Sequence, residues 1–410
     1  NIYTQIYSLI MYILIILIGI FVGLEIPILT RIIENNERNV RKNLANIFTF
    51  DYIGGLIGSI AFPILLFPKL GFITTAFLVG SINIITAVII VFKYSKFIEK
   101  SKIIKITAIA ILIVMLAFLF TGNMITDKIE RGLYRDDVIL SKQTPYQKIV
   151  MTKHKDDLRL FLDGNLQFSS SDEYRYHEAL VHIPMMYAKK HDRVLILGGG
   201  DGLAARELLK YEDIKEIVLV DIDKDMTDLC ATDKQIAKLN NNSLKNEKVQ
   251  VINEDGYMFV QENENKFDVI IIDFPDPNNE SLNKLYTNVF YNHIKANLNE
   301  NGVMVCQSTS PYYAKKSFWC INKTIKSQFE TVIPYHLQVP TFGEWGFNIA
   351  FNGENKREKL EVETQYLNED NIDSMFNFGK DEMLDMNLIE ENDMFKPTLI
   401  TYYNEEVQNW

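Results

Sequence analysis

Cysteine and histidine are scarce in this sequence of 410 residues, which contains three cysteines and six histidines. Cys230, Cys306 and Cys320 are odd in number and lack the spacing of a disulfide framework or of a metal site. We therefore interpret them as free thiols in a reducing compartment. Because histidine and cysteine form no cluster along the sequence, we expect no metal site.

An excess of basic residues is also absent, since 42 lysines and arginines are outnumbered by 53 aspartates and glutamates. The net charge of −11 and the pI near 5.2 argue against non-specific binding to nucleic acid. An acidic chain suits a cationic substrate better, although acidic surfaces also serve solubility alone. We expect no nucleic-acid partner.

Charged residues are rare in four apolar runs of the first third of the chain, at residues 6–24, 52–67, 70–92 and 106–122. A run of about 20 apolar residues crosses a bilayer as a helix, and the first run lacks the cleavage site of a secretory signal. We predict a helical transmembrane domain over residues 1–125, in the lipid bilayer of the cell membrane. Because the chain starts at Asn1, without an initiating methionine, we expect this domain to be truncated at its N-terminus.

Two acidic residues, Glu25 and Asp51, accompany these runs. Carboxylates are costly inside lipid and often line a polar path, but near the ends of a span the headgroup region solvates them. We expect both to lie near segment ends.

The rest of the chain has the pattern of an α/β protein. Strands are predicted near residues 193–197, 216–221, 249–253, 267–273 and 302–307, with helices between them. This alternation predicts a doubly wound, mostly parallel sheet with helices on both faces, over residues 171–352.

Flanking regions surround that domain. A connector at residues 126–141 precedes a small β-region at 140–170, where strands at 146–152 and 158–168 include a turn at Asp163-Gly164. Residues 353–410 form a C-terminal extension, in which 398–403 alternate like a strand.

The strand at residues 193–197 runs directly into Gly198-Gly199-Gly200-Asp201-Gly202, and a helical segment follows. The next strand ends at Asp221, about twenty residues past the glycines. Glycines let a backbone turn tightly and approach a ligand, and an acid at the next strand end can hold a ribose diol. This order of elements predicts a nucleoside site.

Five carboxylates follow the predicted strands: Asp201, Asp221, Asp255, Asp273 and Asp276. Asp221 and Asp255 fall where a ribose and an adenine need acceptors. The other three repel one another unless a cation lies among them. A polyamine is such a cation, with a pKa near 10.4, and it becomes a nucleophile only after a carboxylate accepts one of its protons. The alternative is that some of these acids, Asp276 above all, cap helices.

Six segments together resemble the spermidine synthases, the polyamine aminopropyltransferases. They are residues 162–167 (LDGNLQ), 172–178 (DEYRYHE), 198–202 (GGGDG), 221–223 (DID), 254–256 (EDG) and 273–277 (DFPDP). The resemblance covers about residues 140–352, and the apolar N-terminal third resembles the membrane-fused bacterial branch of that family. It implies a Rossmann-like sheet of the class I methyltransferase type.

The resemblance also implies a reaction, in which decarboxylated S-adenosylmethionine gives its aminopropyl group to the diamine putrescine, forming spermidine and methylthioadenosine. The nucleoside is a co-substrate, and no cofactor is bound permanently. Asp273 matches the family's proton acceptor. Matches to donor-binding residues are Gln147, Gly198, Gly200, Asp201, Asp221, Asp255 and Gly256. Matches on the amine side are Tyr176, His177, Asp201 and Asp276. We also expect a homo-oligomer.

Two departures from the family pattern fall on the amine side. Asn278-Asn279-Glu280 follows where the family continues Gly-Pro-Ala, and Phe342 stands where it has a tyrosine. The amine acceptor is therefore less defined than the donor. Two other functions stay open: a methyltransferase using S-adenosylmethionine, and a membrane transporter or sensor whose second half only binds ligands.

The side of the membrane on which the second half lies is also open. The positive-inside rule places the basic segments 31–42 and 93–105 in the cytoplasm. Four crossings then leave the second half outside. Three crossings, without run 52–67, return it to the cytoplasm but move the second basic segment outside. We favour a cytoplasmic catalytic domain, because its nucleoside ligand is cytosolic.

Overall fold

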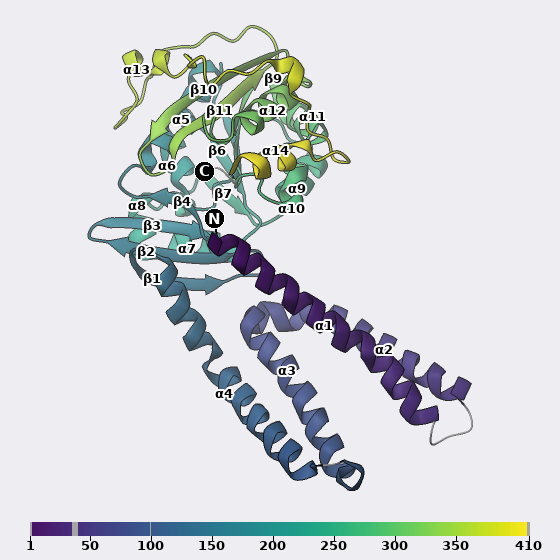
Figure 1. Ribbon diagram of the computed structural model, residues 1–410. Coiled ribbons are helices and arrows are strands. Elements are labelled where there is room, and N and C mark those ends of the chain that lie inside the picture. Colours follow the sequence, from purple (N-terminus) through teal and green to yellow (C-terminus); the bar gives the residue numbers. More distant parts are fainter. Residues whose placement is uncertain (1, 35–39, 99, 408–410) are drawn as a thin grey trace. The chain divides into compact units, whose positions relative to one another are not determined.

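The apolar runs of the first third form long helices in the computed structural model, which describes residues 2–34, 40–98 and 100–407 (Figure 1). The chain divides into two units, residues 1–126 and 127–410, which are described separately below. The long helices are α1 (Ile2–Glu34), α2 (Val40–Ala61), α3 (Phe67–Lys93) and α4 (Ser101–Leu133). A short π-helix, η1 (Phe62–Leu66), contains Pro63 and joins α2 to α3, and a 3-10 turn, η2 (Ser95–Phe97), precedes α4.

Each of the four predicted runs overlaps a helical segment that is long and apolar enough to cross a membrane, by length and composition. These segments are Ser8–Ile32, Leu44–Leu66, Lys69–Lys93 and Ser101–Gly122. Glu25 and Asp51 lie inside the first two segments, and their expected place near the ends of membrane spans stays a prediction. Apolar residues continue the helices beyond both carboxylates. Part of the basic segment 31–42, residues 35–39, lies outside the described residues.

The small β-region is a four-stranded antiparallel sheet of order β1-β2-β3-β4. Its strands are β1 (Asp137–Gln143), β2 (Lys148–His154), β3 (Asp157–Leu162) and β4 (Asn165–Ser169). The predicted turn joins β3 to β4, with φ of 48° at Asp163 and 84° at Gly164. The predicted connector is wrong, because α4 extends to Leu133 and β1 begins at Asp137.

A seven-stranded sheet of order β10-β11-β9-β8-β5-β6-β7 forms the centre of the second unit. The strands are β5 (Arg193–Gly198), β6 (Glu216–Val220), β7 (Val249–Ile252), β8 (Phe267–Asp273), β9 (Leu298–Gln307), β10 (Thr331–Val339) and β11 (Gly343–Phe351). The five predicted strands are present and pair in parallel. The antiparallel hairpin β10–β11 was not predicted. From β5 the chain builds outward to β7 and then returns to β8, so a ligand crevice is expected where β5 and β8 end.

Both faces of this sheet are covered, as the prediction of a doubly wound sheet requires. Along β5, Val194 and Ile196 belong to one buried apolar cluster and Leu195 and Leu197 to another. The first cluster includes α5 and α6, and the second includes α11 and α12. The helices are α5 (Glu173–Tyr187), α6 (Leu203–Leu208), α7 (Lys224–Thr232), α8 (Lys234–Leu239), α9 (Gly256–Glu262), α10 (Glu280–Asn283), α11 (Asn288–Asn297) and α12 (Lys315–Lys326). Short 3-10 turns are η3 (Ser243–Lys245) and η4 (Lys284–Tyr286).

The C-terminal extension contains helices α13 (Glu369–Ser374) and α14 (Thr398–Val407) and a 3-10 turn, η5 (Met386–Leu388). The strand predicted at residues 398–403 is therefore wrong. Leu399 and Tyr403, four positions apart on α14, are both buried. The helix is held by tertiary contacts, since the Glu406 carboxylate accepts the backbone N–H groups of Lys316 and Ser317 at the start of α12.

The Asp163-Gly164 turn allows a test of the small sheet. Gly164 has a positive φ, and a methyl group added to its Cα would point into open space, so alanine there meets only conformational strain. We expect Gly164→Ala to lower the free energy of unfolding by about 1 kcal/mol, measured by tryptophan fluorescence, because Trp319, Trp345 and Trp410 all lie in the second unit. As a control, Gly132→Ala, in helix α4, should be neutral or stabilising. Equal effects of the two changes would contradict the left-handed turn.

Candidate active site

A cavity of about 710 Å³ opens at the carboxyl ends of the parallel strands. Its wall includes every residue that the sequence analysis assigned to donor, amine or proton transfer: Gln147, Tyr176, His177, Gly198, Gly200, Asp201, Asp221, Asp255, Gly256, Asp273 and Asp276. The β3–β4 hairpin contributes Leu162, Asn165 and Gln167, and the β10–β11 hairpin contributes Phe342 and Trp345. Segments far apart in the sequence therefore share one chamber.

The glycine loop brings backbone close to two acidic residues. Gly198 pairs with Asp273 across β5 and β8, and a Cβ at position 198 would lie 2.2 Å from the Asp273 carbonyl oxygen. A Cβ on Gly200 would lie 2.5 Å from Asp221 Oδ2, which accepts the Gly200 N–H at 3.1 Å. No side chain fits at either position. Both residues must therefore be glycine for the loop to keep this conformation and approach a ligand.

Asp221 directly follows β6, and its side chain is partly buried. Its Oδ1 accepts the Asp223 N–H at 2.8 Å, and burial raises its pKa to about 6. Each carboxylate oxygen has two lone pairs, so both oxygens can accept a further hydrogen bond. A pair of ribose hydroxyls is a suitable donor for them.

Asp255 differs from the other acids. Its Oδ1 accepts the Tyr257 N–H at 2.9 Å as the N-cap of α9, and its Oδ2 pairs with Lys284. The sequence left open that some of these acids cap helices. Asp255 has this role in the structure, rather than Asp276. Gln147 is also engaged, since its Nε2 donates to Asp223 Oδ2 at 2.9 Å.

Asp273 lies at the end of β8 and receives a hydrogen bond from Tyr176, with 2.6 Å between the Tyr176 hydroxyl and Oδ1. Burial raises the pKa of Asp273 to about 6, while the nearby His177 opposes this rise. The pKa of Asp201 is also raised, again by burial, although its Oδ1 accepts the Leu203 N–H at 2.8 Å. Buried carboxylates of raised pKa favour a bound cation.

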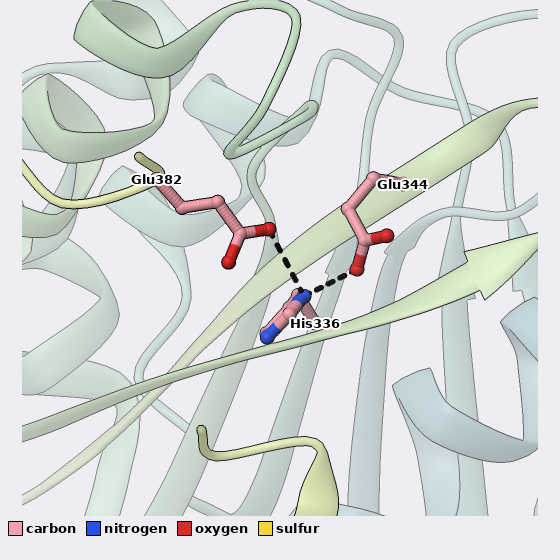
Figure 2. Close-up of side chains that lie close together, drawn as sticks. All are labelled: His336, Glu344 and Glu382. Carbon is pink, nitrogen blue, oxygen red and sulfur yellow. Dashed lines mark hydrogen bonds and ion pairs between the residues drawn. The ribbon is translucent and has the colours of Figure 1, made fainter. Parts of the chain in front are cut away.

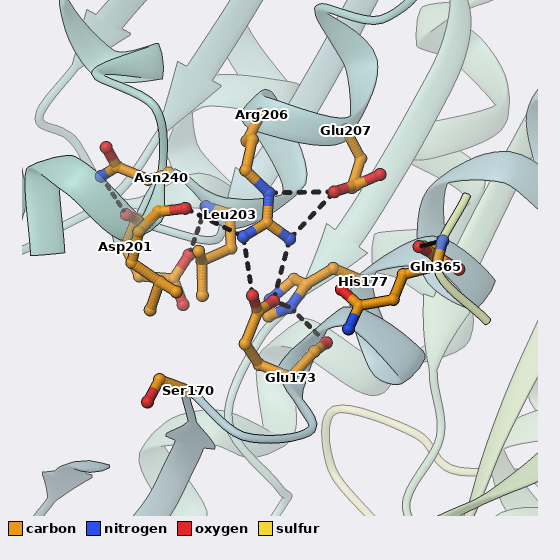
Figure 3. Close-up of polar contacts among 12 residues, drawn as sticks. Ser170, Glu173, His177, Asp201, Leu203, Arg206, Glu207, Asn240 and Gln365 are labelled. Atoms are coloured by element: carbon orange, nitrogen blue, oxygen red, sulfur yellow. Dashed lines mark hydrogen bonds and ion pairs between the residues drawn. The ribbon is translucent and has the colours of Figure 1, made fainter. Parts of the chain in front are cut away.

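A buried ion-pair network holds His177 in place (Figure 3). Its Nδ1 lies 2.8 Å from Glu173 Oε2. Glu173 accepts two hydrogen bonds from Arg206, at 2.6 and 3.0 Å, and Arg206 Nε also donates to Glu207 at 2.9 Å. Burial opposes protonation of His177, but the Glu173 carboxylate outweighs it and raises the His177 pKa to about 9. His177 is thus an imidazolium at neutral pH, beside Asp201 and Asp273.

Asp276 lies three residues beyond the end of β8, and burial raises its pKa to about 6. The Tyr403 hydroxyl donates to Asp276 Oδ2 at 2.9 Å. Sequence analysis missed Tyr403, because residues 398–403 alternate like a strand. The spacing of Leu399 and Tyr403, four apart, is the signal for the helix that carries it.

Comparisons with known proteins agree with this geometry. Residues 173–362 match the family described as the spermine/spermidine synthase domain. The chain is 42% identical over 401 residues to a polyamine aminopropyltransferase of Leptospira interrogans, covering 97% of this chain and 79% of that protein. It is 39% identical over 404 residues to one of Oceanobacillus iheyensis, covering 98% and 79%.

Solved structures of this kind are similar in fold. A crystal structure of a spermidine synthase in complex with the transition state analogue AdoDATO superposes with a TM-score of 0.56 and 28% identity, covering 59% of this chain and 85% of that one. The spermidine synthase of Thermotoga maritima gives a TM-score of 0.54 and 28% identity, covering 59% and 84%.

The charge of His177 makes stability depend on pH. A group whose pKa rises on folding stabilises the protein below its ordinary pKa, and this contribution is lost as pH rises through the folded pKa. With a shift from 6.5 to about 9, we expect the free energy of unfolding to fall between pH 6.5 and 9, by on the order of 3 kcal/mol. His177→Gln should remove this decline in denaturant titrations across that range.

An exposed histidine of strand β2 supplies the matched control. His154→Gln should keep the wild-type decline. A wild-type profile that is flat from pH 6.5 to 9 would show that His177 is neutral in the folded protein. Stability should also depend on pH in the acidic range, because the pKa values of three carboxylates are raised: Asp221, Asp273 and Asp276. The free energy of unfolding of the ligand-free protein should fall as pH rises from about 4 to 6.

Proposed function

Because the chain belongs to the spermine/spermidine synthase family and is a polyamine aminopropyltransferase, we propose that it transfers the aminopropyl group of decarboxylated S-adenosylmethionine to putrescine. The products are spermidine and methylthioadenosine. The observation that carries this proposal is the set of buried carboxylates Asp201, Asp273 and Asp276 around one cavity.

The charges in the cavity suit two cationic reactants. His177 as an imidazolium balances one of the three carboxylates, which leaves a net negative site for a sulfonium with an aminopropyl ammonium and for a diamine. Asp201 is buried, with 8% of its surface exposed, and binds the donor's amino end. The extra carboxylate of ordinary S-adenosylmethionine would meet Asp201 with like charge, so the site selects the decarboxylated donor.

The transfer requires alignment more than bond activation by the protein. The uncharged amine nitrogen attacks the propyl carbon bound to sulfur, the new C–N bond forms as the C–S bond breaks, and the electron pair goes to sulfur. The sulfonium thereby becomes the neutral thioether of methylthioadenosine. Holding nitrogen, carbon and sulfur in line supplies most of the acceleration. Asp221 holds the ribose and the glycine loop bounds the nucleoside.

We assign proton acceptance to Asp273. An aliphatic amine with a pKa near 10.4 must lose one proton to become a nucleophile. Burial raises the pKa of Asp273 from 3.8 to about 6, which narrows the gap between acceptor and amine by about 2 units, or roughly 3 kcal/mol. Tyr176 orients the carboxylate through Oδ1, leaving Oδ2 for the amine.

The far amine group binds at Asp276. Phe342 lines the cavity without a hydroxyl, whereas Tyr403 brings one from α14 to Asp276 Oδ2. We propose that Tyr403 helps to hold the amine by fixing the acidic group that binds it.

We also propose that the enzyme is a multi-pass protein of the cell membrane with its catalytic unit in the cytoplasm. Four helices of the first unit are long and apolar enough to cross a bilayer, by length and composition. A cytoplasmic catalytic unit has access to the nucleoside donor.

A donor-choice assay tests the function. Full-length protein in detergent is incubated with putrescine and either the decarboxylated or the ordinary donor. We expect methylthioadenosine and spermidine with the decarboxylated donor alone, and Asp273→Asn should lower kcat by at least about a hundredfold while sparing nucleoside binding, because it removes a general base. Asp156→Asn, at an exposed site, is the control. Formation of S-adenosylhomocysteine, or ligand binding without turnover, would contradict the proposal.

The role of Tyr403 is tested with the same assay. Tyr403→Phe removes one hydrogen bond to a buried carboxylate, so we expect the KM for the diamine to rise about threefold to tenfold with little change in kcat. Tyr402→Phe, on the neighbouring position of α14, should behave as wild type. An unchanged KM in Tyr403→Phe would exclude the tyrosine from amine binding.

A further inference from the structure

Three side chains outside the cavity converge on one point (Figure 2). His336 comes from β10, Glu344 from β11, and Glu382 from the segment after α13. One ligand atom from each lies within 4.8 Å of the others, and among the described residues this is the only such group of histidine, cysteine and acidic side chains. The cluster joins parts of the chain that no local sequence pattern connects.

The hydrogen bonds of His336 determine which ring nitrogen faces the two glutamates. Nε2 lies 2.9 Å from the backbone oxygen of Asn377, and a carbonyl oxygen only accepts, so Nε2 carries a hydrogen. A neutral ring then presents the lone pair of Nδ1 to Glu344 and Glu382. Three electron-rich groups facing one another require a cation among them.

A proton is a poor match for this arrangement. A proton on Nδ1 can be donated to Glu344, but Glu382 Oε1 lies 3.8 Å from Nδ1, beyond hydrogen-bond reach. Glu382 is 9% exposed, and within the described residues no lysine or arginine forms an ion pair with either glutamate. A single imidazolium would pair with both glutamates and therefore leaves one of their two negative charges unbalanced.

A divalent cation balances the charge of this cluster better than a proton does. Two carboxylates and a neutral imidazole carry a total charge that a divalent cation balances. Ligand atoms each about 2.0–2.2 Å from a Zn²⁺ ion are at most roughly 4.4 Å apart. The 3.8 Å between His336 Nδ1 and Glu382 Oε1 is within this limit. Glu344, which contacts Nδ1 directly, has to move away from it to admit the ion. The N–H of a ligating imidazole is usually donated to a carbonyl or carboxylate, as His336 Nε2 is to Asn377.

We propose that His336 Nδ1, Glu344 and Glu382 bind a divalent transition-metal ion such as Zn²⁺. The ion links the C-terminal extension to the β10–β11 hairpin. Glu344 directly precedes Trp345, and Phe342 lies in the same hairpin turn, so the ion stabilises the wall of the cavity that these two aromatic side chains form.

Metal binding is measured directly, apart from catalysis. Full-length protein in detergent, stripped with a chelator and dialysed, is titrated with Zn²⁺ by calorimetry and with Co²⁺ by visible absorption. We expect one equivalent per chain and a rise in unfolding temperature. Glu344→Gln and Glu382→Gln, which keep the side-chain size, should each weaken binding by at least about tenfold. His336→Gln provides a third variant in case one of these fails to fold.

Glu354→Gln and His154→Gln, at exposed positions, are the matched controls and should bind as wild type. The proposal is overturned if the stripped wild type takes up no stoichiometric Zn²⁺ or Co²⁺, or if the cluster variants bind as tightly as the controls. It is equally overturned if His336→Gln changes only the pH dependence of stability, because the cluster then holds a proton.

Discussion

The site depends on the close approach of two neighbouring strand ends. Gly198 and Asp273 are paired residues of β5 and β8, and a Cβ at position 198 would lie only 2.2 Å from the Asp273 carbonyl oxygen. The order of the strands reverses at this pair, so helices leave the crevice open there. One register thus places the glycine loop and the Asp273 carboxylate side by side.

Charge is the second constraint on the fold. The cavity gathers carboxylates that burial makes harder to ionise. The His177 imidazolium, held by Glu173, which in turn binds Arg206, offsets part of their charge. On the proposed function, binding of cationic substrates stabilises the protein, because each substrate supplies positive charge that the cavity lacks.

Much of the fold and site follows from local patterns. Buried parallel strands are continuous apolar runs, and glycines before a helix identify the nucleoside loop, so β5, β6 and Asp221 were predictable. Pairings between distant segments were not. Lys284 reaches Asp255, Glu382 reaches the β10–β11 hairpin, and α14 is a helix because Leu399 and Tyr403 pack inward and Glu406 caps α12. The propensities of residues 398–403 alone predict a strand, and tertiary packing overrides this preference.

The hydrogen bond from Tyr403 to Asp276 joins positions 127 residues apart. During synthesis on the ribosome, the strands and the glycine loop of the crevice are therefore translated well before α14. Until α14 packs in place, the Asp276 carboxylate lacks the hydrogen bond from Tyr403. On the proposed role of Asp276 in amine binding, substitutions in α14 alone can change the acceptor preference without altering the glycine loop.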